Sequence, residues 1–175
     1  QGSPLMRTRL LGLGLLLLSC YPAGTLMAET DIYIIDDRTS GDLQTSSGTP
    51  WRFVTDGVMG GRSDGRLDAT TRDKRNCLHL QGDVRLDNNG GFIQAALDIS
   101  QTQASNASGY QGLLLDVYGN DEVYNLHLRT DDVWLPWQAY RASFRAPERW
   151  QTVRLPFDQF SGYRIGKQLD LQQLE

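Results

Sequence analysis

The sequence predicts an all-β domain, and two observations support this prediction. Short runs in which apolar and polar residues alternate recur along the chain, and beyond residue 28 no segment long enough for a typical helix keeps a helical period. Groups of Gly, Asn, Asp, Ser and Pro separate these runs. About eight short strands at this spacing are typical of a β-sandwich or barrel.

The first half of the domain holds four expected strands. Each is short and carries apolar residues at alternate positions, as a strand with one buried face does. They are Ile-Tyr-Ile-Ile at 32–35, Trp-Arg-Phe-Val at 51–54, Cys-Leu-His-Leu at 77–80 and Gly-Phe-Ile-Gln-Ala-Ala-Leu at 91–97.

The second half holds four more. Residues 112–118 form a denser apolar run, which predicts a central strand covered on both faces. Residues 124–130 alternate cleanly, and the segments 138–144 and 150–155 complete the set. Turn-forming residues predict chain reversals at 63–65, 87–91, 119–121 and 146–148, and a polar loop at 100–109.

Length and composition limit the class of protein. The 175 residues suffice for one domain with a core and are too few for two full-sized domains. A net charge of −4 with no basic cluster argues against nucleic acid as the main partner, because phosphate binding needs concentrated positive charge. Two Cys cannot build a disulfide-rich scaffold. They also argue against a cysteine-based zinc site, because a closed site takes four ligands and the chain offers only two Cys and two His, so no metal ligands are predicted.

The N-terminus is expected to be a targeting segment. Residues 1–5 resemble a cloning remnant, and Met6 is the expected start. Two arginines then precede an apolar run at 10–18, which is shorter than the roughly 20 residues of a membrane span and typical of an export signal.

Two processing alternatives stay open for this segment. In one, a lipoprotein signal at 6–19 precedes Cys20, which would carry the lipid. In the other, an ordinary signal peptide at 6–28 ends at Ala28. Both predict a periplasmic or extracellular protein that meets a membrane only through a lipid on Cys20.

Four motifs in order resemble one family. They are Trp-Arg-Phe-Val-Thr-Asp-Gly-Val-Met-Gly-Gly-Arg-Ser at 51–63, the pair 80–84 and 88–92, the hairpin 112–119 and 124–130, and the closing segments 140–144, 150–153 and 155–160. Together, across residues 36–174, they resemble the 30 kDa type of complex I intermediate-associated protein.

The resemblance implies a galactose-binding-like jelly-roll β-sandwich spanning residues 29–175. The member for which the family is named helps to assemble respiratory complex I, which implies a protein partner. Members usually continue past a segment like 169–171 into further strands, so the resemblance implies a sandwich without its last strands. No cofactor is implied. Sandwiches of this fold sometimes carry a structural calcium, for which Asp36–Asp37 and Asp131–Asp132 supply oxygen ligands.

The first candidate site is the glycine-rich string that begins at Asp56. Gly60 and Gly61 allow another group to approach the backbone closely. Asp56, Arg62 and Ser63 would then present a carboxylate, a guanidinium and a hydroxyl to a ligand or partner. The structural alternative is a tight connection in which Asp56 and Ser63 bind neighbouring backbone amides.

The second candidate site depends on the pairing of 124–130 with 138–144. If these strands pair, His127, Arg129 and Arg141 form a polar strip on one face, and Trp134 and Trp137 flank it from the connecting loop. Aromatic rings beside the hydrogen-bonding side chains of Arg, Asn or Gln are typical of carbohydrate sites. The alternative is a solvated sheet face with both tryptophans packed as covers.

We therefore expect a non-enzymatic binding protein of the cell envelope, which interacts with a protein and assists the assembly of a membrane complex. A carbohydrate-binding module is the alternative. Catalysis has little support, since the chain has two histidines and no Gly-x-Ser-x-Gly motif.

Overall fold

Antiparallel strands form most of the regular structure in the computed structural model, which describes residues 31–87 and 91–175. The predictions for residues 1–5, for the signal at 6–19 or 6–28 and for Cys20 lie outside the described residues, as do residues 88–90 of one expected turn. Asp31–Glu175 forms one compact unit. In the described part of the chain, no helix is long and apolar enough to cross a membrane.

The strands pair in four antiparallel groups, which confirms the all-β prediction and fits a β-sandwich. β1 (Trp51–Thr55) pairs with β4 (Ile93–Leu97), β2 (Asp64–Arg72) with β3 (Arg75–Asp83), and β5 (Gly112–Val117) with β8 (Gln151–Pro156). β7 (Ala139–Ala146) lies between β6 (Glu122–Leu128) and β9 (Ser161–Tyr163). Short 3₁₀ helices connect strands in the described residues: η1 (Asp56–Met59), η3 (Gln103–Ser105) and η4 (Phe157–Gln159).

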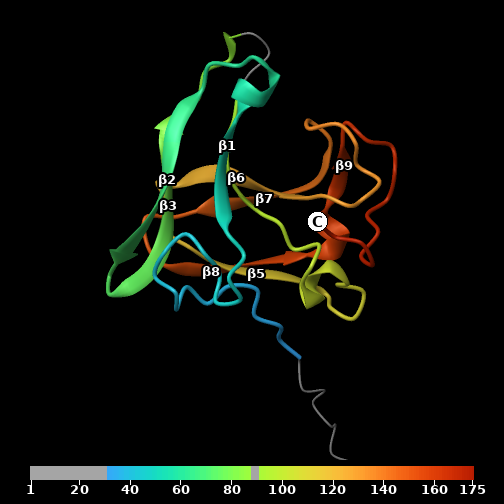
Figure 1. Cartoon of the computed structure of the whole chain (residues 1–175), viewed down its shortest axis with the longest axis horizontal. Coiled ribbons are helices and arrows are strands. Elements are labelled where there is room, and N and C mark those ends of the chain that lie inside the picture. Colours follow the sequence, from blue (N-terminus) through green and yellow to red (C-terminus); the bar gives the residue numbers. More distant parts are fainter. Residues whose placement is uncertain (1–30, 88–90) are drawn as a thin grey trace, which may run out of the picture. The chain divides into compact units, whose positions relative to one another are not determined.

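Two of these strand groups enclose the core. Figure 1 shows the β5–β8 pair and the β6–β7 pair as two layers, and apolar side chains from both layers meet in one cluster. Tyr140 of β7 is 1% exposed, and its hydroxyl donates a hydrogen bond to the Gln168 carbonyl at 3.0 Å. Leu128 of β6 and Leu155 of β8 are also buried. Burial of these side chains fixes which face of each strand points inward.

The β2–β3 hairpin is attached to the β5–β8 layer by aromatic and charged contacts. The Arg72 guanidinium lies 3.8 Å from the ring centre of Tyr118, which packs edge-on against Trp150 at 5.8 Å. Arg75 lies 5.4 Å from the Trp150 ring and 3.8 Å from the Asp116 carboxylate. Figure 1 shows the hairpin crossing the ends of the two layers.

Seven of the eight expected strands are present. The prediction of a strand at 32–35 is wrong. Tyr33 and Ile35 do pack against the core, while Ile32 and Ile34 are exposed. The alternation therefore predicted correctly that one face of this segment is buried. It did not predict strand pairing, because no strand in the described residues pairs with residues 32–35.

The turn expected at 63–65 is also wrong, because β2 begins at Asp64. Gly65 lies opposite Gly82 in the β2–β3 ladder, and a Cβ on Gly65 would lie 2.4 Å from the Gln81 carbonyl oxygen. Glycine at position 65 allows the two strands to approach closely, and it does not form a turn. Close to the turns expected at 119–121 and 146–148, the chain bends at residues 120–121 and 148–149, and Asp121 lies in the left-handed region at φ 64°.

The expectation that 112–118 is covered on both faces is wrong. β5 pairs with β8 alone, Leu114 is 56% exposed and Asp116 faces solvent. Leu113 and Leu115 point toward the core cluster. The run is apolar on both faces in sequence, yet only one face is buried in the described structure.

Because β2 and β3 are in close contact, any side chain at position 82 is expected to lower the stability of the fold. A Cβ there would lie 2.2 Å from the Asp64 carbonyl oxygen, and backbone on both sides would have to move. We expect Gly82→Ala to lower the free energy of unfolding by about 1–3 kcal/mol in urea denaturation. Gly109→Ala is the matched control, because nothing lies within 4 Å of its Cβ position. Equal stability of the two variants would contradict this packing.

Candidate functional site

The Asp56 carboxylate is a buried junction between three segments. Asp56 is 0% exposed at the start of η1. One carboxylate oxygen accepts a hydrogen bond from the Ser63 backbone amide at 2.9 Å, and the other accepts bonds from the Ser63 hydroxyl and the Gly91 amide. The Ser63 hydroxyl oxygen in turn accepts a bond from the Arg85 amide at 2.9 Å. The carboxylate thus joins η1, the start of β2 and the segment that leads into β4.

These bonds keep the carboxylate charged. Burial by itself raises the pKa of Asp56, but the bonds from Ser63, Gly91 and Phe92 outweigh it, so the pKa lies below its ordinary value. Gly61 is needed beside the carboxylate, since a Cβ there would lie 2.2 Å from the Asp56 Cγ.

The first predicted site therefore does not form a rim that could face a ligand. Asp56 and Ser63 are buried and bound to backbone amides, as the structural alternative expected. Gly60 caps η1 in the left-handed region at φ 86°, and Arg62 is exposed. Of the groups expected to face a ligand, the Arg62 guanidinium alone is presented to solvent.

The second predicted site has the expected strand pairing. β6 and β7 are antiparallel neighbours, and His127 lies directly opposite Arg141. One step along the same face, the Ser143 hydroxyl donates to the Asn125 side-chain oxygen at 2.7 Å. Desolvation, and then the positive charge of Arg141, lower the pKa of His127 below its ordinary value, so the ring is neutral at pH 7.

Tyr163, which covers this pair from β9, was not among the predicted site residues. Its ring stacks on His127 with centroids 6.1 Å apart and an interplanar angle of 19°. The Arg141 guanidinium lies 4.2 Å from the Tyr163 ring centre. The strand β9 is Ser-Gly-Tyr, whose first two residues are typical of turns, so the local sequence contains little strand signal.

Arg129 does not join the polar strip, which corrects the prediction. β6 ends at Leu128, and the Arg129 guanidinium instead donates hydrogen bonds to three backbone carbonyls of the following loop. The acceptors are Leu135 at 3.2 Å, Gln138 at 3.0 Å and Val133 at 2.7 Å. Arg129 therefore fixes the conformation of residues 133–138, which we call the Trp loop.

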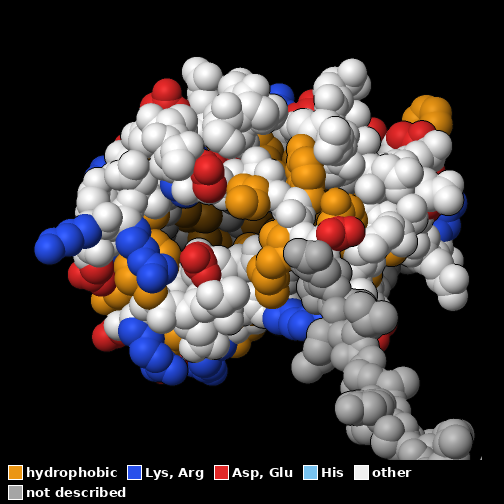
Figure 2. Space-filling view, turned by 90° about the horizontal axis from the view of Figure 1, so that it is seen from below, with side chains coloured by type: hydrophobic (Ala, Val, Ile, Leu, Met, Phe, Trp, Pro, Cys, Tyr) orange, Lys and Arg blue, Asp and Glu red, His pale blue; other side chains and the backbone are white. Residues whose placement is uncertain are grey.

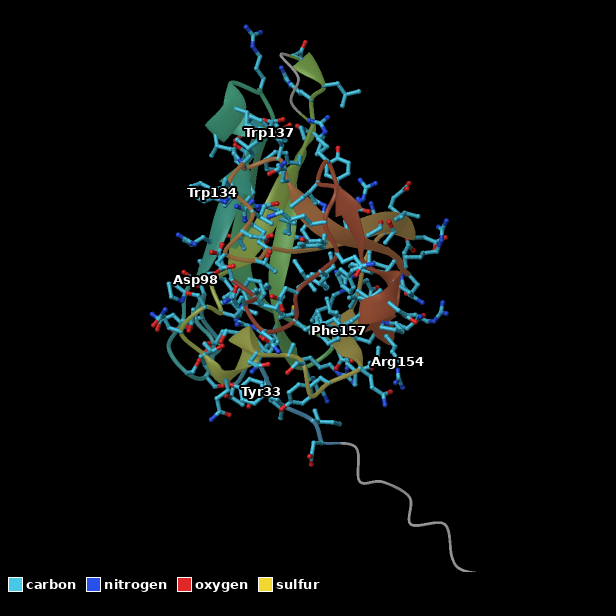
Figure 3. The ribbon with its side chains drawn as sticks, turned by 90° about the vertical axis from the view of Figure 1, so that its right-hand side faces the viewer. Tyr33, Asp98, Trp134, Trp137, Arg154 and Phe157 are labelled. Atoms are coloured by element: carbon cyan, nitrogen blue, oxygen red, sulfur yellow. The ribbon has the colours of Figure 1, made fainter. Side chains whose placement is uncertain are left out.

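The Trp loop presents apolar side chains to solvent. Trp134 is 86% exposed, and Leu135 and Trp137 are 41% and 40% exposed. The loop joins β6 to β7, as expected, and whether the tryptophans flank the strip stays a prediction. The alternative in which they are packed as covers does not hold for Trp134. Figure 3 shows both tryptophans toward one end of the domain and Tyr33 toward the other.

The acidic pairs considered for calcium have other partners. The Asp36 carboxylate accepts a bond from the Trp51 indole at 2.6 Å and pairs with Arg38 at 2.7 Å. Asp132 pairs with Lys167 at 2.7 Å. Across residues 31–87 and 91–175, no group of three His, Cys, Asp or Glu side chains is placed to hold a metal ion.

Comparison with known proteins gives one match. The family model described as Complex I intermediate-associated protein 30 matches residues 40–175. Comparisons with curated proteins and with solved structures gave no match.

The buried junction predicts acid sensitivity. Because the folded-state pKa of Asp56 is below the unfolded value of about 3.9, its charge stabilises the fold above roughly pH 4, and this contribution is lost as the pH falls through the folded pKa. We expect Asp56→Asn to lower the urea midpoint at pH 7 and to flatten its dependence on pH below 4.

The exposed neighbour Asp64 supplies the control for this prediction. Asp64→Asn should not change the urea midpoint at pH 7 appreciably. If Asp56→Asn unfolds at the same urea concentration as the unsubstituted protein, Asp56 does not hold the three segments together.

Proposed function

Since the chain belongs to the complex I intermediate-associated protein 30 family, we propose that it is a protein-binding assembly factor for a membrane complex. We propose further that the Trp loop is the centre of its partner-binding surface. The family supports a role in assembly. The exposed side chain of Trp134, on a loop fixed by Arg129, is the observation that supports this choice of surface.

The fixed loop favours binding for a physical reason. Tryptophan supplies a large apolar area, and buried tryptophans are among the side chains that contribute most at protein interfaces. A loop that is already ordered loses little conformational entropy on binding. Three hydrogen bonds from Arg129, together with the Val133 amide bond to the Thr130 carbonyl at 2.9 Å, hold the loop in one arrangement.

The cell envelope is the proposed location. The charged and apolar pattern of residues 6–28 supports export, with either release after Ala28 or a lipid anchor on Cys20. An exported protein would meet a membrane complex from its outer side. The partner would then be a subunit with a surface in the periplasm or outside the cell.

The proposal includes no catalysis. His127 is the one histidine at the candidate surface, and its ring stacks on Tyr163 beside a cation. Among the described residues no carboxylate forms a hydrogen bond or an ion pair with this ring, so nothing there supports the base–orienter pair of a catalytic histidine.

Site-specific cross-linking tests the proposed surface. A photoreactive amino acid replaces Trp134 or Trp137 in the full-length chain, in cells that naturally make it. We expect one protein, a subunit of a membrane complex, to be captured from both positions. Leu114, which is 56% exposed on β5, is the control position and should capture none of it. Arg129→Met should reduce the yield from position 134 roughly tenfold, because about 1.4 kcal/mol of loop order is lost.

Equal capture from Leu114, or capture of a protein unrelated to any membrane complex, would contradict this assignment. Retained cross-linking in Arg129→Met would show that loop order does not matter for binding.

A cleft near Tyr33 favours carbohydrate binding as a second candidate function. Its volume is about 630 Å³, within the range of small-molecule sites. One aromatic ring, Tyr33, is accompanied mainly by hydroxyl, amide and charged groups; the other lining residues are Ser47, Thr49, Pro50, Arg52, Asp98, Gln101, Thr102 and Gln103. Hydrogen bonds from Ser100, joined by the charge of Arg52, lower the pKa of Asp98, so it is an ionised acceptor. Figure 2 shows that the face of the domain seen from below is hollowed, with hydrophobic side chains inside the hollow and hydrophobic, charged and polar groups at its edge.

A panel of neutral oligosaccharides tests this second function by calorimetry. We expect a ligand whose affinity falls about tenfold in Gln103→Ala, because a sugar hydroxyl would lose its amide partner. The control is Gln151→Ala, on the exposed part of β8. The absence of binding to any member of the panel would exclude the cleft as a saccharide site.

A further inference from the structure

The Tyr163 ring lies against two guanidinium groups. The Arg141 Cζ is 4.2 Å from the ring centre and the Arg164 Cζ is 5.4 Å from it, while His127 stacks on the same ring. We call these four side chains the Tyr163 platform. Two positive charges are thus held beside an aromatic ring on the β6–β7–β9 sheet.

The two guanidinium groups of the platform lack acidic partners. In the described part of the chain, neither the Arg141 side chain nor the Arg164 side chain makes a hydrogen bond or an ion pair. Other cations of the same region are paired. Arg145 of β7 lies 3.4 Å from Asp121, and Lys167 lies 2.7 Å from Asp132. The platform therefore keeps its hydrogen-bond donors available for an anionic group from outside.

The platform is ordered without a ligand. Register places Ala139 opposite Tyr163 and Arg141 opposite Ser161. Arg164 has a left-handed backbone at φ 56°, which a residue with a side chain adopts only where its surroundings hold it. The Gln138 side-chain amide donates to the Arg164 carbonyl at 3.0 Å. Gln138 also ends the Trp loop, so this hydrogen bond joins the loop to the backbone of the platform residue Arg164.

We propose that the Tyr163 platform binds carboxylate groups of acidic side chains on the partner protein. This inference rests on the proposed function, because it names the chemistry of the partner that the Trp loop contacts. Guanidinium groups bind carboxylates with two parallel hydrogen bonds, and a guanidinium oriented by an aromatic ring loses little freedom on binding.

The observations favour carboxylates on a protein over a polyanion. The chain has a net charge of −4, and the platform contains two unpaired guanidinium groups, whereas nucleic acid binding needs a wide basic surface. Trp134 and Leu135 of the Trp loop add exposed apolar area, which an acidic segment with apolar residues would cover.

Imidazole NMR signals test this inference directly. The chain has two histidines: His127 in the platform and His79 on β3. The full-length protein is titrated with a hexaglutamate peptide, with hexaglutamine as the neutral control. We expect the His127 signals to shift in a saturable way with hexaglutamate alone, and the His79 signals to stay unchanged.

Charge-removing variants locate the binding. Arg141→Gln and Arg164→Gln should each weaken hexaglutamate binding at least tenfold. Arg145→Gln is the matched control on the same strand, and its affinity should stay within about twofold, because its charge is already paired with Asp121. Unchanged dispersion of the amide spectrum shows that each variant is folded.

Three results would overturn the inference. They are an unshifted His127 at saturating hexaglutamate, equal loss of affinity in all three variants, and binding of inorganic phosphate in preference to the peptide. The titration needs no natural partner. Failed cross-linking at Trp134 with an intact platform would therefore contradict the proposed function alone.

Discussion

The register of β6 on β7 determines the whole candidate surface. Tyr140, opposite Leu128, is 1% exposed, and its burial prevents the two strands from slipping by one residue. This register places His127 opposite Arg141 on the outer face and ends β6 where Arg129 reaches the Trp loop. A slip would bury the charged residues and expose the core. Packing of the core therefore determines which residues lie on the surface, and the same strand register positions both the platform and the loop.

Packing and binding are assigned to different parts of the molecule. The glycine-rich string around Asp56 is the most distinctive motif of the sequence, yet its carboxylate is buried and bound to backbone amides. It holds three segments together and leaves Arg62 exposed. The Trp loop, by contrast, presents the exposed Trp134 side chain, and the Tyr163 platform presents guanidinium groups that pack on an aromatic ring and have no acidic partner among the described residues.

Sequence patterns predicted the structure well where burial alternates along a strand. They failed for residues whose role depends on contacts with segments that are distant in the sequence. Alternation located seven strands and the inward faces of Tyr33 and Ile35, although residues 32–35 pair with no strand of the described part. The family resemblance is confirmed over residues 40–175. Gly65 predicted a turn because a close contact with Gly82 cannot be distinguished from a turn in sequence. Arg129 and Tyr163 depend on contacts with the loop and with β9, which local patterns do not contain.

Hydrogen exchange of the full-length protein, free and bound to its captured partner, tests the central claim most directly. If the partner covers the Trp loop and the Tyr163 platform, exchange should slow at residues 133–138 and 161–165. It should stay unchanged in the β2–β3 hairpin, at residues 64–83. Protection confined to that hairpin, with unchanged exchange in the Trp loop, would contradict the account.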